Sequence, residues 1–163
     1  MTKFIGAGLV VFAAALLLAP PAPAQQPWFD MQNCAFCKNI TAEEGLMDHI
    51  TMWDHHNTAN GMVTITTIAP EYVDAYKRAM ANMENTGEAM KQGKMLPMCG
   101  MCQSMGMLMQ QGAKYETVES GNVFVSMMYS DNPEVIQKIH EWTDHTNAEM
   151  KKMEEMPKGE SAD

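Results

Sequence analysis

Two cysteine pairs with the same spacing are the residues of this chain best suited to chemistry. Cys34 and Cys37 lie in the segment "CAFC", and Cys99 and Cys102 lie in "CGMC". Two intervening residues let both sulfurs of a pair point at one centre, and the N–H groups of a following helix stabilise thiolates. Such a pair suits Cu(I), half of a tetrahedral Zn(II) site, thiol–disulfide exchange or a structural disulfide.

Methionine supplies a second set of soft donors, because the chain has 19 methionines in 163 residues. Met98 directly precedes the second pair and Met101 lies inside it. A thioether binds Cu(I) without having to lose a proton, so these two residues are candidate auxiliary ligands. Most other methionines recur at helical spacing, and we interpret them as core residues that fill irregular gaps.

No other side chains in the sequence form a recognisable site. The five histidines do not cluster, and we predict that they lie on the surface. They are His49, His55, His56, His140 and His145. The sequence contains no glycine-rich phosphate loop, no HExxH motif and no nucleophile elbow, so it assigns no catalytic residue.

Composition and the first residues indicate an exported protein. The formal net charge of −9 disfavours binding to nucleic acids or to anionic membranes. Lys3, an apolar run over residues 4–18 and small residues at 22 and 24 predict a secretory signal peptide over residues 1–24. The run is shorter than the roughly 20 residues that a spanning helix needs. We therefore expect a periplasmic or secreted mature chain, starting at Gln25, without a membrane span.

The stretches that follow the two cysteine pairs look alike. The pairs lie 65 residues apart, and Pro70 and Pro133, each followed by glutamate, lie 63 residues apart. Each stretch reads as CxxC, a short helix, a β-hairpin and a long helix, with "VTITTI" and "VFVSMMY" as strands rich in β-branched and aromatic residues. We therefore predict an internal duplication, with repeats at about residues 28–92 and 93–156.

The two repeats are expected to combine, because one hairpin and its helices bury too little core to stand alone. We predict a single α+β domain over residues 25–156, with a four-stranded antiparallel sheet and packed helices, followed by a flexible tail at 157–163. If "PWFDM" and "KMLPM" add short strands, the element order resembles that of the heavy-metal-associated ferredoxin-like domain. The resemblance covers that order and the CxxC. No final strand follows either long helix, and the glycine-threonine usual before the first cysteine is missing.

These features favour a non-enzymatic protein that binds a soft metal, Cu(I) in preference to Zn(II), for metal carriage, sensing or detoxification. The expected ligands are Cys34, Cys37, Cys99 and Cys102. The expected partners are the metal ion and a metal-delivering or redox partner protein.

Two alternatives use the same four cysteines. They could form the dithiol couples of a periplasmic thiol–disulfide oxidoreductase, or structural disulfides of a non-catalytic module in any of three connectivities. Sulfurs of the two pairs within about 4 Å of one another would favour a single metal site, since Zn–S bonds are about 2.3 Å long.

Overall fold

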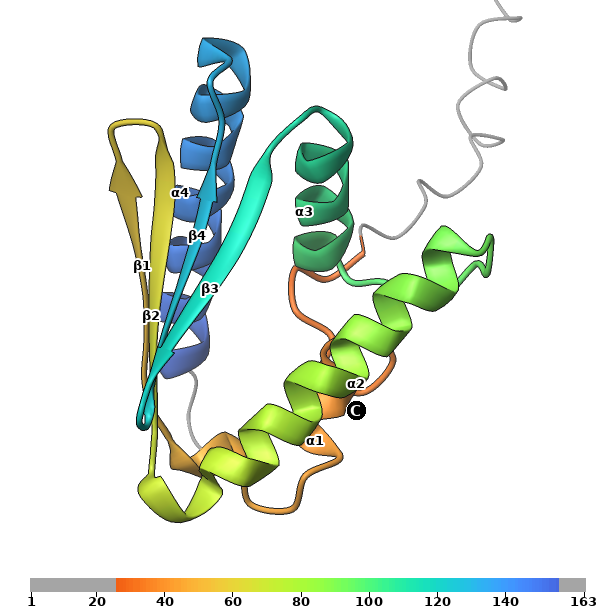
Figure 1. The fold of residues 1–163 in the computed structure, drawn as a ribbon, viewed down its shortest axis with the longest axis vertical. Helices are drawn as coiled ribbons and strands as arrows, with labels where there is room; N and C mark the ends of the chain where they lie inside the picture. The colour runs from red at the N-terminus through yellow and green to blue at the C-terminus, as the bar shows by residue number, and fades with distance from the viewer. Residues whose placement is uncertain (1–25, 156–163) are drawn as a thin grey trace, which may run out of the picture.

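A computed structural model describes residues 26–155 of the chain. It confirms an α+β fold with a four-stranded antiparallel sheet and several helices (Figure 1). The predicted signal peptide and the predicted tail lie outside the described residues. Within residues 26–155, no helix combines the length and the apolar character that crossing a membrane requires.

The sheet consists of two β-hairpins joined along their second strands. The first hairpin is β1 (Ile50–Thr58) and β2 (Gly61–Ile68), and the second is β3 (Lys114–Ser120) and β4 (Val123–Tyr129). The strand order is β1-β2-β4-β3, and Thr64 of β2 lies opposite Ser126 of β4. Gly61 allows the hairpins to meet closely, because a Cβ on this residue would lie 2.0 Å from the Met128 carbonyl oxygen.

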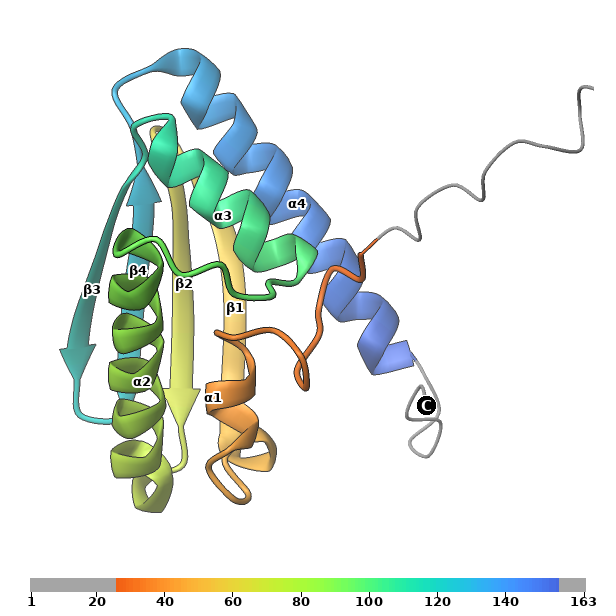
Figure 2. The ribbon, with the colours of Figure 1, turned by 90° about the vertical axis from the view of Figure 1, so that its right-hand side faces the viewer.

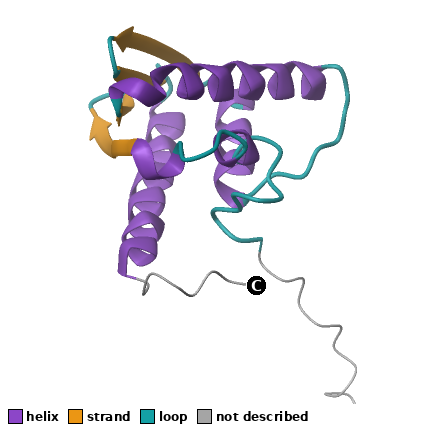
Figure 3. Ribbon diagram, turned by 90° about the horizontal axis from the view of Figure 1, so that it is seen from below, coloured by secondary structure: helices purple, strands orange, loops and turns teal. Residues whose placement is uncertain are grey.

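The helices lie on one face of this sheet (Figure 2). They are α1 (Lys38–Thr41), α2 (Val73–Lys91), α3 (Gly100–Gln110) and α4 (Pro133–Glu155), with short 3-10 turns at Met47–His49 and Pro70–Tyr72. Side chains alternate along β2, and the side chains at 62, 64, 66 and 68 are buried beneath the helices. Seen from below, the strands gather at one side of the molecule and helices occupy the rest (Figure 3).

The core has two main parts between the sheet and the helices. One packs α3 and α4 on the sheet around Met62, Met128 and Ile139, and the other packs α1 and α2 around Ile68 and Phe124. A third, smaller cluster is formed by cysteines. Its neighbour Met101 also contacts the first part of the core, and Met31 also contacts the second. The cysteines therefore lie where the two parts of the core meet.

The structure differs from the sequence predictions in three places. Met109 and Met153, two of the methionines interpreted as core residues from their helical spacing, are exposed. The segments expected to add strands, residues 27–31 and 94–98, are turns or irregular chain. His55, predicted to lie on the surface, is only 6% exposed, because α4 covers that part of β1. Its Nδ1 lies 2.8 Å from the Thr64 hydroxyl, and its ring packs edge-on against Trp142. The internal duplication stays a prediction.

Candidate metal centre

The first cysteine pair is held by a tight turn that leads into α1. The Asp30 carboxylate accepts the backbone N–H of Gln32 and of Asn33, and the Asp30 carbonyl accepts the N–H of Cys34. These bonds reverse the chain just before the pair. Cys37 then occupies the N-cap position of α1.

The second pair begins a longer helix. Cys99 is the N-cap of α3, with extended backbone angles, and its carbonyl accepts the N–H of Gln103 at 2.9 Å. Gly100 allows Trp28 to pack closely on the start of α3, because a Cβ on this residue would lie 3.2 Å from the Trp28 ring. The sulfur at a helix N-cap faces free N–H groups, which favour the thiolate.

Each pair is hydrogen-bonded to the segment that precedes the other. Ala35, inside the first pair, donates its N–H to the Pro97 carbonyl at 2.8 Å. Gly100, inside the second pair, donates its N–H to the Pro27 carbonyl at 3.0 Å. This reciprocal pairing brings together two segments that lie 65 residues apart.

The four sulfurs consequently meet. All four Sγ atoms lie within 4.8 Å of one another, and the Sγ of Cys37 lies 3.7 Å from that of Cys99 and 3.6 Å from that of Cys102. A tetrahedral ion with bonds of about 2.3 Å to sulfur places its ligands roughly 3.8 Å apart. The two sulfurs of a disulfide lie only about 2.05 Å apart. The two distances from Cys37 match the spacing of ligands around one ion, and the four sulfurs together form a group that could hold one.

The cluster is almost closed to solvent. Cys34 and Cys99 are each 1% exposed and Cys37 is 4% exposed, whereas Cys102 is partly exposed. The side chains that pack around the sulfurs are Met31, Phe36 and Met101. An apolar surrounding of this kind strengthens metal–thiolate bonds by excluding water.

Hydrogen bonds between the thiols shift their pKa values in opposite directions. The Cys102 and Cys37 thiols donate to Cys99 and hold the pKa of the Cys99 thiol far below its usual value. Bonds to Cys37 and Cys99, together with burial, raise the pKa of the Cys102 thiol. The Cys102 bond lowers the pKa of Cys37, but the Cys99 bond and burial raise it by more. A bound metal must therefore displace protons from Cys37 and Cys102.

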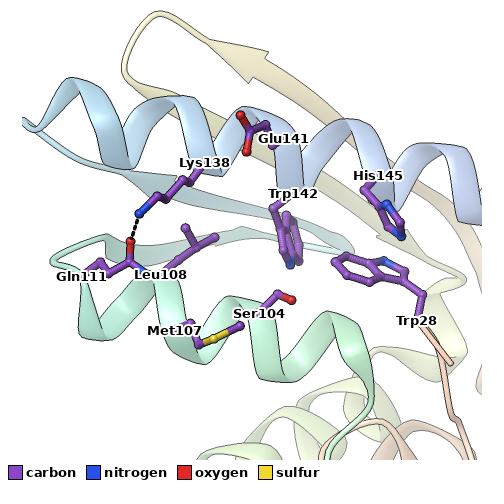
Figure 4. A pocket seen from close by; sticks show the side chains of 9 residues that line it. All are labelled: Trp28, Ser104, Met107, Leu108, Gln111, Lys138, Glu141, Trp142 and His145. Atoms are coloured by element: carbon purple, nitrogen blue, oxygen red, sulfur yellow. Dashed lines mark hydrogen bonds between the residues drawn. The ribbon is translucent and has the colours of Figure 1, made fainter. Parts of the chain in front are cut away.

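Two tryptophan residues are hydrogen-bonded to the backbone of Met101, which lies inside the second pair. Trp142 donates its Nε1–H to the Met101 carbonyl at 3.2 Å, and the Trp28 carbonyl accepts the Met101 N–H at 3.0 Å. Both indoles line a hollow of about 350 Å³ between α3 and α4. Figure 4 shows them there, with the His145 ring beside that of Trp28, tilted by 57° at a centroid distance of 4.1 Å. No cysteine lines this hollow. The hollow is a feature separate from the sulfur cluster.

The structure brings together most, but not all, of the candidate ligands named from the sequence. The four cysteines come together, and Met101 packs against them, whereas Met98 is not among the side chains that pack on the cluster. Among residues 26–155, no histidine joins a group that could hold an ion. Sequence reasoning missed the packing of Phe36 on the sulfur cluster and the hydrogen bond from Trp142 to the Met101 carbonyl, because no sequence pattern marks either contact.

Comparison with known proteins returns no relative. No family model, curated protein or solved structure matches the chain. What the protein does is therefore inferred from its own cysteine cluster.

Proposed function

We propose that this chain is an exported protein that binds one soft metal ion through the thiolates of Cys34, Cys37, Cys99 and Cys102, for metal carriage, sensing or detoxification. One observation carries the proposal. Four sulfurs from two distant segments, on three buried cysteines and one partly exposed cysteine, lie within 4.8 Å of one another, and two of the distances match those between the ligands of a tetrahedral ion. Buried thiols gathered in this way have a clear physical use as ligands of a common ion.

The arrangement favours Zn(II) over Cu(I), although the sequence alone favours Cu(I). Zn(II) takes four thiolates in a tetrahedron, and four cysteines are gathered here, whereas two thiolates suffice for Cu(I). Four thiolates around Zn(II) also leave one negative charge fewer than around Cu(I). In a site this buried, and with apolar neighbours, the smaller net charge costs less desolvation free energy.

Cu(I) is the second candidate, favoured by the two thioethers beside the cluster. Met31 and Met101 both pack against the cysteines. Neutral thioethers add to a Cu(I) site without adding charge, so two thiolates and one thioether could hold the ion while the other thiols keep their protons.

The same geometry counts against the two alternatives. Thiol–disulfide exchange needs an accessible thiolate, yet Cys99, whose pKa is lowered, is only 1% exposed, and the partly exposed Cys102 has a raised pKa. Structural disulfides need bonded sulfurs, yet all four cysteines are free thiols in the structure. A metal site uses all four residues as they stand.

Purification of the mature protein from the periplasm without reductant tests the proposal. We expect about one metal ion per chain by elemental analysis, and four thiols that react completely with excess reagent only after the metal is removed. Substitution with Co(II) is expected to give the intense visible absorption of a tetrahedral thiolate complex. Two disulfides and no metal, even after reduction and reconstitution with Zn(II) or Cu(I), would contradict it.

A further inference from the structure

The four cysteine residues differ in their exposure to solvent. Cys34, Cys37 and Cys99 are at most 4% exposed, but Cys102 is partly exposed. A molecule arriving from solution therefore meets the cluster at Cys102. A metal held here has one open edge.

Helix α2 closes the side of the first pair. Phe36, between the two cysteines of that pair, packs on the sulfur cluster. Its ring lies 4.0 Å from the position that a Cβ on Gly87 of α2 would occupy, and α1 packs along α2 (Figures 1 and 2). Approach to Cys34 or Cys37 would require this helix to move.

Helix α3 leaves the side of the second pair open. Cys99, at the N-cap of α3, is 1% exposed, whereas Met101 and Cys102 in the first turn are partly exposed and the following Gln103 is exposed. Solvent therefore comes closer to the cluster at the first turn of α3 than at its N-cap. The solvent-accessible edge of the sulfur cluster therefore lies at the start of α3.

We propose that Cys102 is the exchange ligand of this site, through which the chain passes its metal to, or receives it from, a partner that presents a dithiol. This inference rests on the proposed function. Release begins when one thiol of the partner approaches the metal beside Cys102. A metal–sulfur bond to the partner forms as the metal–Cys102 bond breaks, and the proton of the incoming thiol moves to Cys102. No atom is oxidised or reduced.

A dithiol fits this step better than a single thiol. One thiol replaces one of four ligands and leaves the metal chelated by three buried cysteines. A second thiol on the same molecule then acts at a high effective concentration and displaces the next ligand. The chemistry of the partner is therefore that of a CxxC segment.

Alkylation of the metal-loaded mature protein tests the exchange edge. Zn(II)-loaded protein is treated with a small amount of iodoacetamide, and only the singly modified species is mapped by mass spectrometry. We expect Cys102 to be modified at least about tenfold more often than any other cysteine, because reaction requires access to the sulfur. Equal labelling of the four, or first labelling at a different cysteine, would overturn the inference.

Transfer of the metal tests the partner and offers a matched pair of variants. Zn(II) should pass to a CxxC peptide faster than to free cysteine at equal thiol concentration, and equal rates would overturn the dithiol partner. Relative to each variant's own spontaneous release, the peptide should accelerate release from Cys102→Ser more than from Cys34→Ser, since only the first leaves its vacancy at the open edge. Equal or reversed accelerations would contradict the role of Cys102.

These outcomes separate the inference from the proposed function. A protein that retains neither Zn(II) nor Cu(I) contradicts the proposed function itself. A protein that binds metal through all four cysteines, yet is not labelled first at Cys102, contradicts only the exchange edge.

Discussion

The two cysteine pairs share a spacing but not a setting. The first pair precedes a helix of four residues, lies against α2 and has both sulfurs buried. The second pair begins a helix of eleven residues, is anchored through Met101 to two tryptophans, and has one buried and one partly exposed sulfur. The same CxxC motif is therefore fully buried on one side of the sulfur cluster and partly exposed to solvent on the other.

Removal of the metal should have the largest effect and should act on both pairs. Zn(II) at about 1,000 times its dissociation constant is expected to raise the free energy of unfolding by about 4 kcal/mol. Urea titration with and without a chelator measures this difference. Hydrogen exchange at the N–H groups of Ala35 and Gly100, which join the pairs, should accelerate in the metal-free protein. Unchanged stability and exchange would show that the metal does not hold the pairs together.

Substitution of single cysteines should distinguish the closed side from the open side. Cys37→Ser is expected to weaken Zn(II) binding by about 1,000-fold, because the vacancy is buried and water cannot fill it. Cys102→Ser should cost only about 30-fold, since solvent reaches that position. Competition with a chromophoric chelator measures both affinities. Equal losses would remove the difference between the two sides.

Acid should destabilise the region that supports the second pair. Burial lowers the pKa of His55, which packs on Trp142, to about 4 from 6.5. Between these values the unfolded chain binds a proton at His55 that the folded chain does not. Stability should therefore fall as pH drops through this window, by on the order of 3 kcal/mol in total.

Urea unfolding of the metal-free protein from pH 7 to pH 4 measures this dependence. His55→Gln should flatten the pH profile. His56→Gln serves as the matched control, because His56 is the exposed neighbour on the same strand and burial is the main cause of the lowered His55 pKa, so this replacement should keep most of the pH dependence. A profile that does not respond to His55→Gln would assign the acid sensitivity to other groups.

Replacement of methionines should have the smallest effect and should depend on the metal. Met101→Leu is expected to weaken Cu(I) binding about threefold to tenfold and to leave Zn(II) binding unchanged, because a thioether is a ligand that Cu(I) prefers. Met98→Leu, the control, should change neither affinity, since Met98 does not pack on the cluster. Equal effects of the two variants would exclude Met101 as an auxiliary ligand.

The sequence predicted the strands and the four candidate ligands, but it could not show how the ligands meet. Alternating β-branched residues at 61–68 and 123–129 mark strands through their own side chains. The meeting of the pairs depends on the carbonyls of Pro27 and Pro97, and every residue carries a carbonyl, so no side-chain pattern marks these two. His55 was placed wrongly for a related reason. Its burial depends on α4, which lies far away in the sequence.

X-ray absorption at the metal edge of the Zn(II)-loaded protein tests the central claim most directly. The four-thiolate site predicts four sulfur neighbours at about 2.3 Å and no nitrogen or oxygen ligand. The spectrum of Cys102→Ser should then show three sulfurs and one lighter atom. A native spectrum with two or fewer sulfurs would contradict the claim that the two cysteine pairs hold one ion.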